Sequence, residues 1–230
     1  SSAASDVYKR QVSSTVPCST KWMVGTVNSF YIGIIATVIA TALGTLAALG
    51  LSRPHMPYKG LIMAILISPM IVPLIITAAG MFFFYARINL VYTFTGVILA
   101  HVALATPFVV ITVTATLVGF DMNMVKAAQS LGAKPMRTFF KVIMPLILPG
   151  IISGALFAFI TSFDEVVIVM FMASIDQLTI PKQMWAGIRQ EISPVILCMA
   201  TCLVLLSIFL LTTVELLRRR SEKLRGIKAR

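Results

Sequence analysis

The sequence is poor in charged residues, in acids and in the residues that bind metals. Charged residues make up 12% of its 230 positions, and it has eight Asp or Glu, two His and three Cys. A soluble domain of this length needs far more polar surface, so water is not the main solvent of this chain. Three cysteines form no disulfide framework, and Cys198 and Cys202 share a helical face in an apolar block with no His or acid near them in sequence. We therefore expect no soluble fold, no metal and no other cofactor.

Long apolar blocks take the place of the missing charge. The chain is 58% hydrophobic, and its mean hydropathy is +0.95. Five blocks of at least 20 predominantly apolar residues cover about 28–51, 61–85, 97–119, 147–172 and 195–217. A helix of about 20 apolar residues crosses about 30 Å of hydrocarbon. The sequence therefore predicts an all-α bundle of about five transmembrane helices.

The basic residues lie in the loops between these blocks, and the net charge is +11. No soluble basic domain carries them, so we exclude nucleic acid as a partner and expect anionic membrane lipid beside them. With the carboxyl-terminal tail inside the cell, thirteen cations lie inside, namely Arg53, Lys59, Lys126, Lys134, Arg137, Lys141 and seven in residues 218–230. Six lie outside, namely Lys9, Arg10, Lys21, Arg87, Lys182 and Arg189. This bias predicts a cytoplasmic tail.

Two expectations concern the amino terminus. Residues 1–11 are polar and lack the apolar core of a signal peptide, so we expect a non-native leader that takes no part in the fold. Five spans with a cytoplasmic tail place residue 28 near the outer face. We therefore expect that the native protein has one further N-terminal span.

Small residues and prolines inside the blocks suit a helix bundle that moves. Small residues recur every four positions, at Ala36, Ala40, Gly44 and Ala48, and form one smooth helix face for close contact with another helix. Prolines are expected to interrupt the second and third spans, at Pro69, Pro73 and Pro107. Taken alone, each feature is better explained by ordinary packing or an ordinary kink.

The inner loop, residues 120–150, is the most informative stretch of the chain. Residues 125–131 read as a short helix, Gly132 permits a left-handed stop, and Pro135 suits the first turn of a second helix. The second helix has an apolar stripe formed by Met136, Phe139, Phe140 and Ile143, with Lys134, Arg137 and Lys141 on its other side. Such a helix either docks in the groove of a partner protein or lies on the membrane surface.

This loop resembles the EAA loop of ABC importer permeases. The family pattern is Glu-Ala-Ala, three residues, Gly, nine residues, then Ile-x-Leu-Pro, and here Ala127, Ala128, Gly132 and Pro145 match it. Lys126 stands where the family has its acid, which reverses the charge. The resemblance covers about residues 24–220 and is closest to the spermidine/putrescine-type branch, through segments such as HVALATPFVVITVTATL and FAFITSFDEVVI.

The resemblance implies a type I ABC importer permease of MetI-like architecture in the bacterial cytoplasmic (inner) membrane. Residues 24–220 would form the permease domain, 120–150 its cytoplasmic coupling loop and 218–230 a basic cytoplasmic tail. The implied partners are cytoplasmic ATPase subunits, a second homologous permease subunit and an extracytoplasmic substrate-binding protein. The residues expected to contact the ATPase are Lys126, Ala127, Ala128, Gly132, Pro135, Phe139 and Pro145. No GxxxxGK followed by Ser or Thr occurs in the sequence, so energy must come from a partner, and we expect no enzyme.

Asp164 and Glu165 lie within the fourth predicted span, beyond its midpoint towards the outside. A carboxylate facing lipid there costs several kcal/mol, so each must face protein, water or a cation. One hypothesis is that a carboxylate binds a cationic substrate on its path, with Phe159 or Phe163 contributing a cation–π contact. The other is a structural role, with the acid bonded to groups of another helix. Adjacent helical residues point about 100° apart, so the two acids can differ in role.

Two further features are weaker. His101, near the outer end of the third span, is expected to be a hydrogen-bonded packing residue rather than a proton relay. The outer loop, residues 173–194, could receive the binding protein through Asp176, Lys182, Trp185, Arg189 and Glu191, or Trp185 could simply anchor the interface.

We favour ATP-driven, binding-protein-dependent import of a polyamine or a related small organic cation. A stand-alone secondary transporter or channel would need internal repeats or a coupling-ion site, and only Asp164 and Glu165 are available for one. An intramembrane enzyme would need a cluster of catalytic groups, and His55 and His101 lie far apart in sequence. An ABC importer of another small solute remains an alternative.

Overall fold

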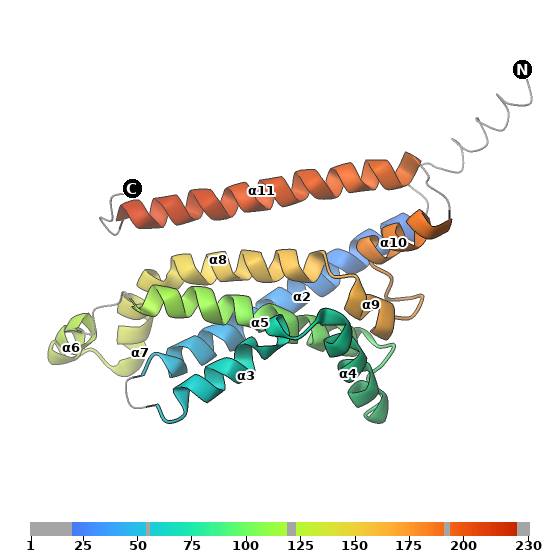
Figure 1. The fold of residues 1–230 in the computed structure, drawn as a ribbon. Coiled ribbons are helices and arrows are strands. Elements are labelled where there is room, and N and C mark those ends of the chain that lie inside the picture. Colours follow the sequence, from blue (N-terminus) through green and yellow to red (C-terminus); the bar gives the residue numbers. More distant parts are fainter. Residues whose placement is uncertain (1–19, 54–55, 119–122, 191–193, 225–230) are drawn as a thin grey trace, which may run out of the picture.

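The computed structural model describes residues 20–53, 56–118, 123–190 and 194–224. All regular structure in these ranges is helical, and Figure 1 shows its arrangement. The elements in chain order are α2 (Thr20–Leu51), α3 (Lys59–Ile71), α4 (Leu74–Arg87), α5 (Phe94–Val118), α6 (Asn123–Ser130), α7 (Pro135–Thr138), the π-helical turn η1 (Phe139–Ile143), α8 (Met144–Phe163), α9 (Val167–Met172), α10 (Ile180–Gln190) and α11 (Pro194–Leu224). The expected leader, residues 1–11, and residues 225–230 of the tail lie outside the described residues.

The described helices include four that are long and apolar enough to cross a membrane, within Trp22–Leu51, Phe94–Val118, Pro135–Phe163 and Val195–Thr213. The pair α3 and α4 passes the same test together but is bent by 104°. If this pair is one broken span, the total is five. The predicted all-α bundle of about five spans is therefore confirmed.

The fourth span has different limits from those predicted. The helix begins at Pro135 instead of residue 147, because α7, η1 and α8 run on without a break into the apolar segment. It ends at Phe163 instead of residue 172, and α9 follows as a separate short helix. Residues 144–150 are therefore helical and continuous with the apolar part of the span. Asp164 and Glu165 lie at a break between helices rather than inside one.

Helices α2, α5 and α8 form the centre of the bundle (Figure 1). Ala36, Ala40 and Ala48 of α2 are fully buried. At Gly44, a Cβ atom would come within 2.6 Å of the Val109 Cβ of α5. Without a hydrophobic driving force between helices in lipid, such close backbone approach supplies the packing energy. The predicted smooth face of small residues is confirmed as the contact surface of α2.

The prolines act differently from one another. Pro73 stands at the start of α4, directly after the chain leaves α3 through an extended Val72, so the break predicted at this proline is confirmed. Pro69 and Pro107 lie inside continuous helices, so the predicted interruptions at these two positions are wrong. A proline inside a helix removes one hydrogen bond, and neighbouring helices in a bundle can compensate for that loss.

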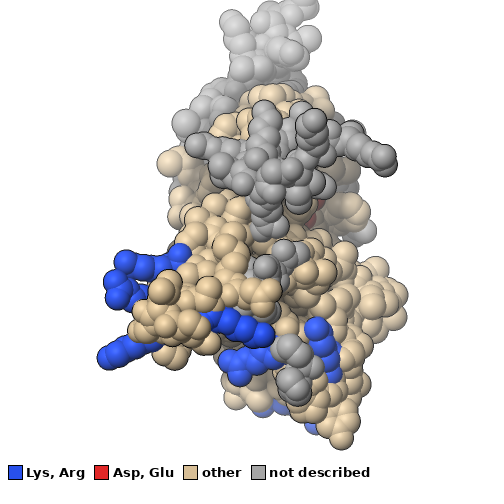
Figure 2. Space-filling view, turned by 90° about the vertical axis from the view of Figure 1, so that its left-hand side faces the viewer, with Lys and Arg blue, Asp and Glu red and all other residues tan. Residues whose placement is uncertain are grey.

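The two ends of the bundle differ in charge. The loop after α2, the start of α3, the segment from α6 to η1 and the carboxyl-terminal part of α11 all lie at one end (Figure 1). Basic side chains gather on this end (Figure 2), and the exposed ones are Arg53, Lys59, Lys126, Lys134, Arg137 and Lys141. The opposite end carries α9 and α10. The cations assigned to the cytoplasmic loops therefore share one surface of the fold, as a cytoplasmic orientation of that end requires.

Candidate functional site: a coupling segment and a broken span

Residues 123–143, comprising α6, α7 and η1, are called the coupling segment below. Helix α6 ends in a Schellman motif, in which the Gly132 N–H donates to the Gln129 carbonyl at 2.9 Å and the Ala133 N–H to the Ala128 carbonyl at 3.0 Å. This turn needs a left-handed residue, and Gly132 has φ +77°. A Cβ atom at Gly132 would meet no atom within 4 Å, so the backbone conformation alone selects glycine. The predicted left-handed stop is confirmed.

The second helix begins at Pro135, as predicted, because proline is preorganised for the first helical turn. Its predicted apolar stripe is divided between two environments. Phe139 is partly buried and Ile143 packs against the core, whereas Met136 and Phe140 are exposed. The rings of Phe139 and Phe140 meet edge to face, with centroids 5.1 Å apart. Phe139 therefore anchors the segment, and Phe140 stands outside it.

An exposed apolar surface, the apolar tip, is formed by Leu131, Met136 and Phe140. Leu131 is 89% exposed, although it follows directly on α6. Of the residues expected to contact an ATPase, Lys126, Ala127, Gly132, Pro135 and Pro145 are exposed, while Ala128 and Phe139 are partly buried. An exposed apolar surface of this kind is typical of a binding site.

The break after α8 places its two acids in different environments. Asp164 closes the last turn of α8, with its N–H donating to the Ile160 carbonyl at 3.0 Å, and its side chain is exposed. Glu165 is only 8% exposed, and its Oε1 accepts a hydrogen bond of 2.9 Å from the Ile168 N–H in the first turn of α9. Glu165 thus satisfies a backbone donor that the short helix would otherwise leave unpaired. The carboxylate left to meet a solute is that of Asp164.

Asp164 borders a cavity of about 420 Å³ beside the broken span. The cavity is lined by Leu74, Ile160, Thr161, Asp164, Glu165, Val166 and Val167. Leu74 belongs to the first turn of α4, so the two interrupted helices of the bundle meet at this cavity. In the described part of the chain no cation pairs with Asp164. An intramembrane carboxylate in such a place can bind a cationic group.

Phe159 and Phe163 do not line this cavity. Their rings stack with centroids 5.3 Å apart, and Phe163 meets Phe30 of α2 edge to face at 5.0 Å. The expectation that these rings assist the acid has no support in the geometry, because they pack α8 against α2 instead.

His101 is 1% exposed, and its Nδ1 lies 2.8 Å from the Ser162 Oγ of α8. The bond joins the third and fourth spans in the bundle interior. The prediction of a hydrogen-bonded packing residue is confirmed.

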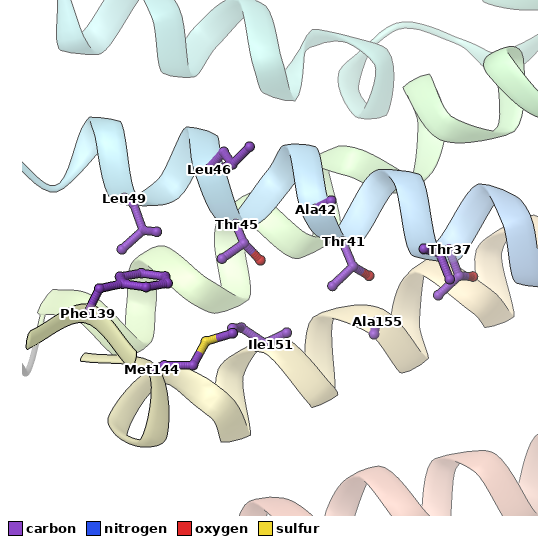
Figure 3. A pocket seen from close by; sticks show the side chains of 11 residues that line it. Thr37, Thr41, Ala42, Thr45, Leu46, Leu49, Phe139, Met144, Ile151 and Ala155 are labelled. Carbon is purple, nitrogen blue, oxygen red and sulfur yellow. The ribbon is translucent and has the colours of Figure 1, made fainter. Parts of the chain in front are cut away.

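A second cavity, of about 520 Å³, lies between α2 and α8 (Figure 3). Thr37, Thr41 and Thr45 line it, and their buried hydroxyl groups have no hydrogen-bond partner within the described ranges of the chain. Other threonines of the same bundle donate to the carbonyl four residues earlier, as Thr106 and Thr116 do. The remaining walls are mostly apolar, including Leu49, Phe139, Met144 and Ile151. This cavity offers hydroxyl groups and no charge.

The two cavities face opposite sides of α8. Ala155 lines the hydroxyl cavity and Asp164 the acidic one, nine residues further along the helix. At about 100° per residue, nine residues correspond to about two and a half turns, which is half a turn out of phase.

The outer loop is folded against the bundle. Its Lys182 points inwards, and its Nζ donates to the Val169 and Ala173 carbonyls at 3.0 Å each. Burial lowers the pKa of the Lys182 ammonium below its ordinary value. Asp176 and Trp185 are exposed, as docking of a partner requires. Glu191 lies outside the described residues.

A helical bundle with a broken span, an acidic cavity and a structured basic segment at one end is the architecture of a membrane permease. The sequence matches the family described as "Binding-protein-dependent transport system inner membrane component" over residues 19–223. The chain belongs to this family, and it is a multi-pass protein of the cytoplasmic membrane that acts as a non-enzymatic translocation subunit.

Two bacterial permease proteins are similar to this chain over most of its length. It is 30% identical over 196 residues to the spermidine/putrescine transport system permease protein PotC of Haemophilus influenzae, covering 85% of this chain and 76% of the relative. It is 30% identical over 181 residues to the putrescine transport system permease protein PotI of Escherichia coli K12, covering 75% of this chain and 64% of the relative.

Solved structures share the fold. An amino acid ABC transporter solved with histidines superposes with a TM-score of 0.64 at 18% identity, covering 87% of this chain and 94% of the other. The inward-facing MetNI methionine ABC transporter gives a TM-score of 0.55 at 19% identity, covering 92% of this chain and 100% of the other. The expected type I importer permease fold is confirmed.

Proposed function

We propose that this chain is the permease subunit of an ATP-driven importer of polyamines or a related small organic cation. The names of the PotC and PotI relatives support the substrate class. The observation that carries the proposal is the exposed Asp164 carboxylate, which borders a cavity at the interrupted fourth span and pairs with no cation among the described residues. A neutral solute would need no such group, and an importer of another small solute is the alternative.

Substitution of Asp164 tests the cation site. Two unit charges about 4 Å apart interact by about 4 kcal/mol at an effective dielectric constant of about 20, and solvent at an exposed side chain reduces this. We expect Asp164→Asn to lower spermidine uptake about tenfold, which corresponds to about 1.4 kcal/mol. The assay uses liposomes holding the complete transporter, ATP inside and saturating loaded binding protein outside.

Two variants serve as controls for this measurement. Glu215→Gln removes an exposed carboxylate of α11, and we expect normal uptake because Glu215 does not line the cavity and lies outside the outer loop. Glu165→Gln keeps an oxygen that can accept the Ile168 N–H, so we expect a smaller loss than for Asp164→Asn. Normal uptake by Asp164→Asn at a normal protein level refutes the cation site and leaves the permease role standing.

The partners follow from the two ends of the bundle. We propose that the apolar tip and its surrounding cations dock in a cleft of a cytoplasmic ATPase subunit, in the manner of a helix held in a groove. The exposed face of the outer loop would receive the substrate-binding protein, and a second homologous permease subunit would complete the path. Lys126 is exposed on α6, so it can meet an acid of the ATPase where other members of the family present an acid themselves.

A further inference from the structure

Helix α9, Val167–Met172, connects the acidic cavity to the outer loop. A helix of six residues is too short to be stable alone, and its ends leave backbone donors and acceptors unpaired. Glu165 accepts from the Ile168 N–H at one end. Lys182 donates to the Val169 and Ala173 carbonyls at the other end. One side chain thus bonds the short helix at each end, while the Tyr92 N–H donates to the Met172 carbonyl at 2.9 Å and the buried face of α9 packs on α4 and α5.

The charges of these two side chains match the helix dipole. An anion is favourable at a helix N-terminus and a cation at a C-terminus. Lys182, in α10, lies 13 residues beyond Val169 in sequence, so its bond is a tertiary contact rather than a local cap. Its ammonium is half-buried, and the two carbonyls replace water around it.

The segment that carries Lys182 is fixed to α2. The Asn28 Nδ2 donates to the Asp176 carbonyl at 2.8 Å and to the Leu178 carbonyl at 3.0 Å. The Ile180 N–H, at the start of α10, donates to the Ser29 Oγ at 2.9 Å. The loop and α10 thus form one unit with the outer end of α2, and Lys182 links this unit to α9.

The other side of this unit faces outwards. Ile175 is 83% exposed, and Trp185 and Ile188 of α10 are also exposed. Ile175, Trp185 and Ile188 are called the outer apolar patch. Exposed apolar side chains in the outer loop and α10 are suited to a protein partner rather than to water alone. A force applied to this patch reaches Lys182 through α10.

We propose that Lys182 is a positioning residue that transmits docking of the binding protein at the outer apolar patch, through α9, to Asp164. Movement of α10 shifts the ammonium, the ammonium shifts the C-terminal carbonyls of α9, and the N-terminus of α9 carries Glu165 and the adjoining Asp164. The helix is short and fixed at both ends, so it moves as a rigid body. This inference rests on the proposed function, because it assigns a role to the outer surface in the same import cycle.

Lys182→Met and Lys182→Arg test the inference in the complete transporter in nanodiscs. Methionine keeps the unbranched stem and removes the charge and the donors, whereas arginine keeps both. In Lys182→Met we expect amide hydrogen exchange in residues 167–173 to rise about tenfold, because the last turn of α9 loses its side-chain partner. We also expect basal ATPase activity to persist and its stimulation by spermidine-loaded binding protein to fall at least fivefold. Lys182→Arg should restore most of both.

Arg87→Met is the matched control, since Arg87 is an exposed cation at the same end of the fold, in the last turn of α4. It should change neither exchange in α9 nor stimulation. Unchanged exchange in Lys182→Met, or faster exchange with full stimulation, overturns the inference. Equal loss of stimulation in Arg87→Met also overturns it, because the effect would then be one of charge alone. A wild-type complex without stimulation contradicts the proposed function instead, and the exchange measurement still shows whether Lys182 holds α9.

Discussion

Replacing Gly132 with alanine changes one backbone preference and no packing contact. The residue has φ +77°, and a Cβ atom there would meet nothing within 4 Å. Gly132→Ala therefore destabilises this turn only by the free energy of a left-handed conformation at an L-residue, about 1–2 kcal/mol. A free-energy change of this size shifts the equilibrium between the intact and the broken Schellman turn about 5- to 30-fold towards the broken form. The two Schellman bonds of α6 open first, and the apolar tip loses its fixed position.

The assay measures how tightly purified ATPase subunit binds the permease complex. We expect Gly132→Ala to weaken binding about 5- to 30-fold and Gly132→Asn to weaken it less, because Asn tolerates the left-handed region. Gly50→Ala is the control, since Gly50 lies near the same end, in α2, has no positive φ and would also meet no atom within 4 Å. Unchanged binding by Gly132→Ala refutes the argument that this turn presents the docking surface.

Two further predictions concern the bundle. Gly44→Ala places a Cβ atom 2.6 Å from the Val109 Cβ, so we expect the stability of the detergent-solubilised complex to fall by about 1–3 kcal/mol. Thermal unfolding measures this, and Gly80→Ala, whose Cβ atom would meet nothing within 4 Å, is the control. Equal unfolding temperatures for Gly44→Ala and wild type contradict the prediction. Thr45→Val replaces a buried hydroxyl that has no partner, so we expect equal or greater stability. Spermidine uptake should stay normal in Thr45→Val, and a loss comparable to that of Asp164→Asn would show that the solute passes the threonines.

The coupling segment was largely predictable because its geometry is set by single residues. Gly132 is required by a positive φ and Pro135 by a restricted first turn, and both restrictions act within a few residues of sequence. The close approach of α2 to α5 was predictable for the same reason, since only Gly44 and its alanine neighbours permit it. The family resemblance then favoured docking over membrane adsorption, and docking stays a prediction.

The broken fourth span was not predictable from hydropathy. Residues 147–172 are apolar on both sides of the two acids, yet α8 ends at Phe163 and Glu165 caps the start of α9 through the Ile168 N–H. The π-helical turn at Phe139–Ile143 has no sequence signature in this chain, yet it lets the inner helix run into the span. The inward position of Lys182 depends on α9, α10 and α2 together, so only the folded chain reveals it.

The most direct measurement uses a photo-crosslinking amino acid in place of Phe140, in the complete transporter embedded in native lipid. Phe140 is exposed, as are Leu131 and Met136, the other two residues of the apolar tip. The account predicts a crosslink from this position to the cytoplasmic ATPase subunit, with a yield that changes when ATP is added. Crosslinks to lipid alone, at full transport activity, would contradict the claim that this segment receives the force that drives import.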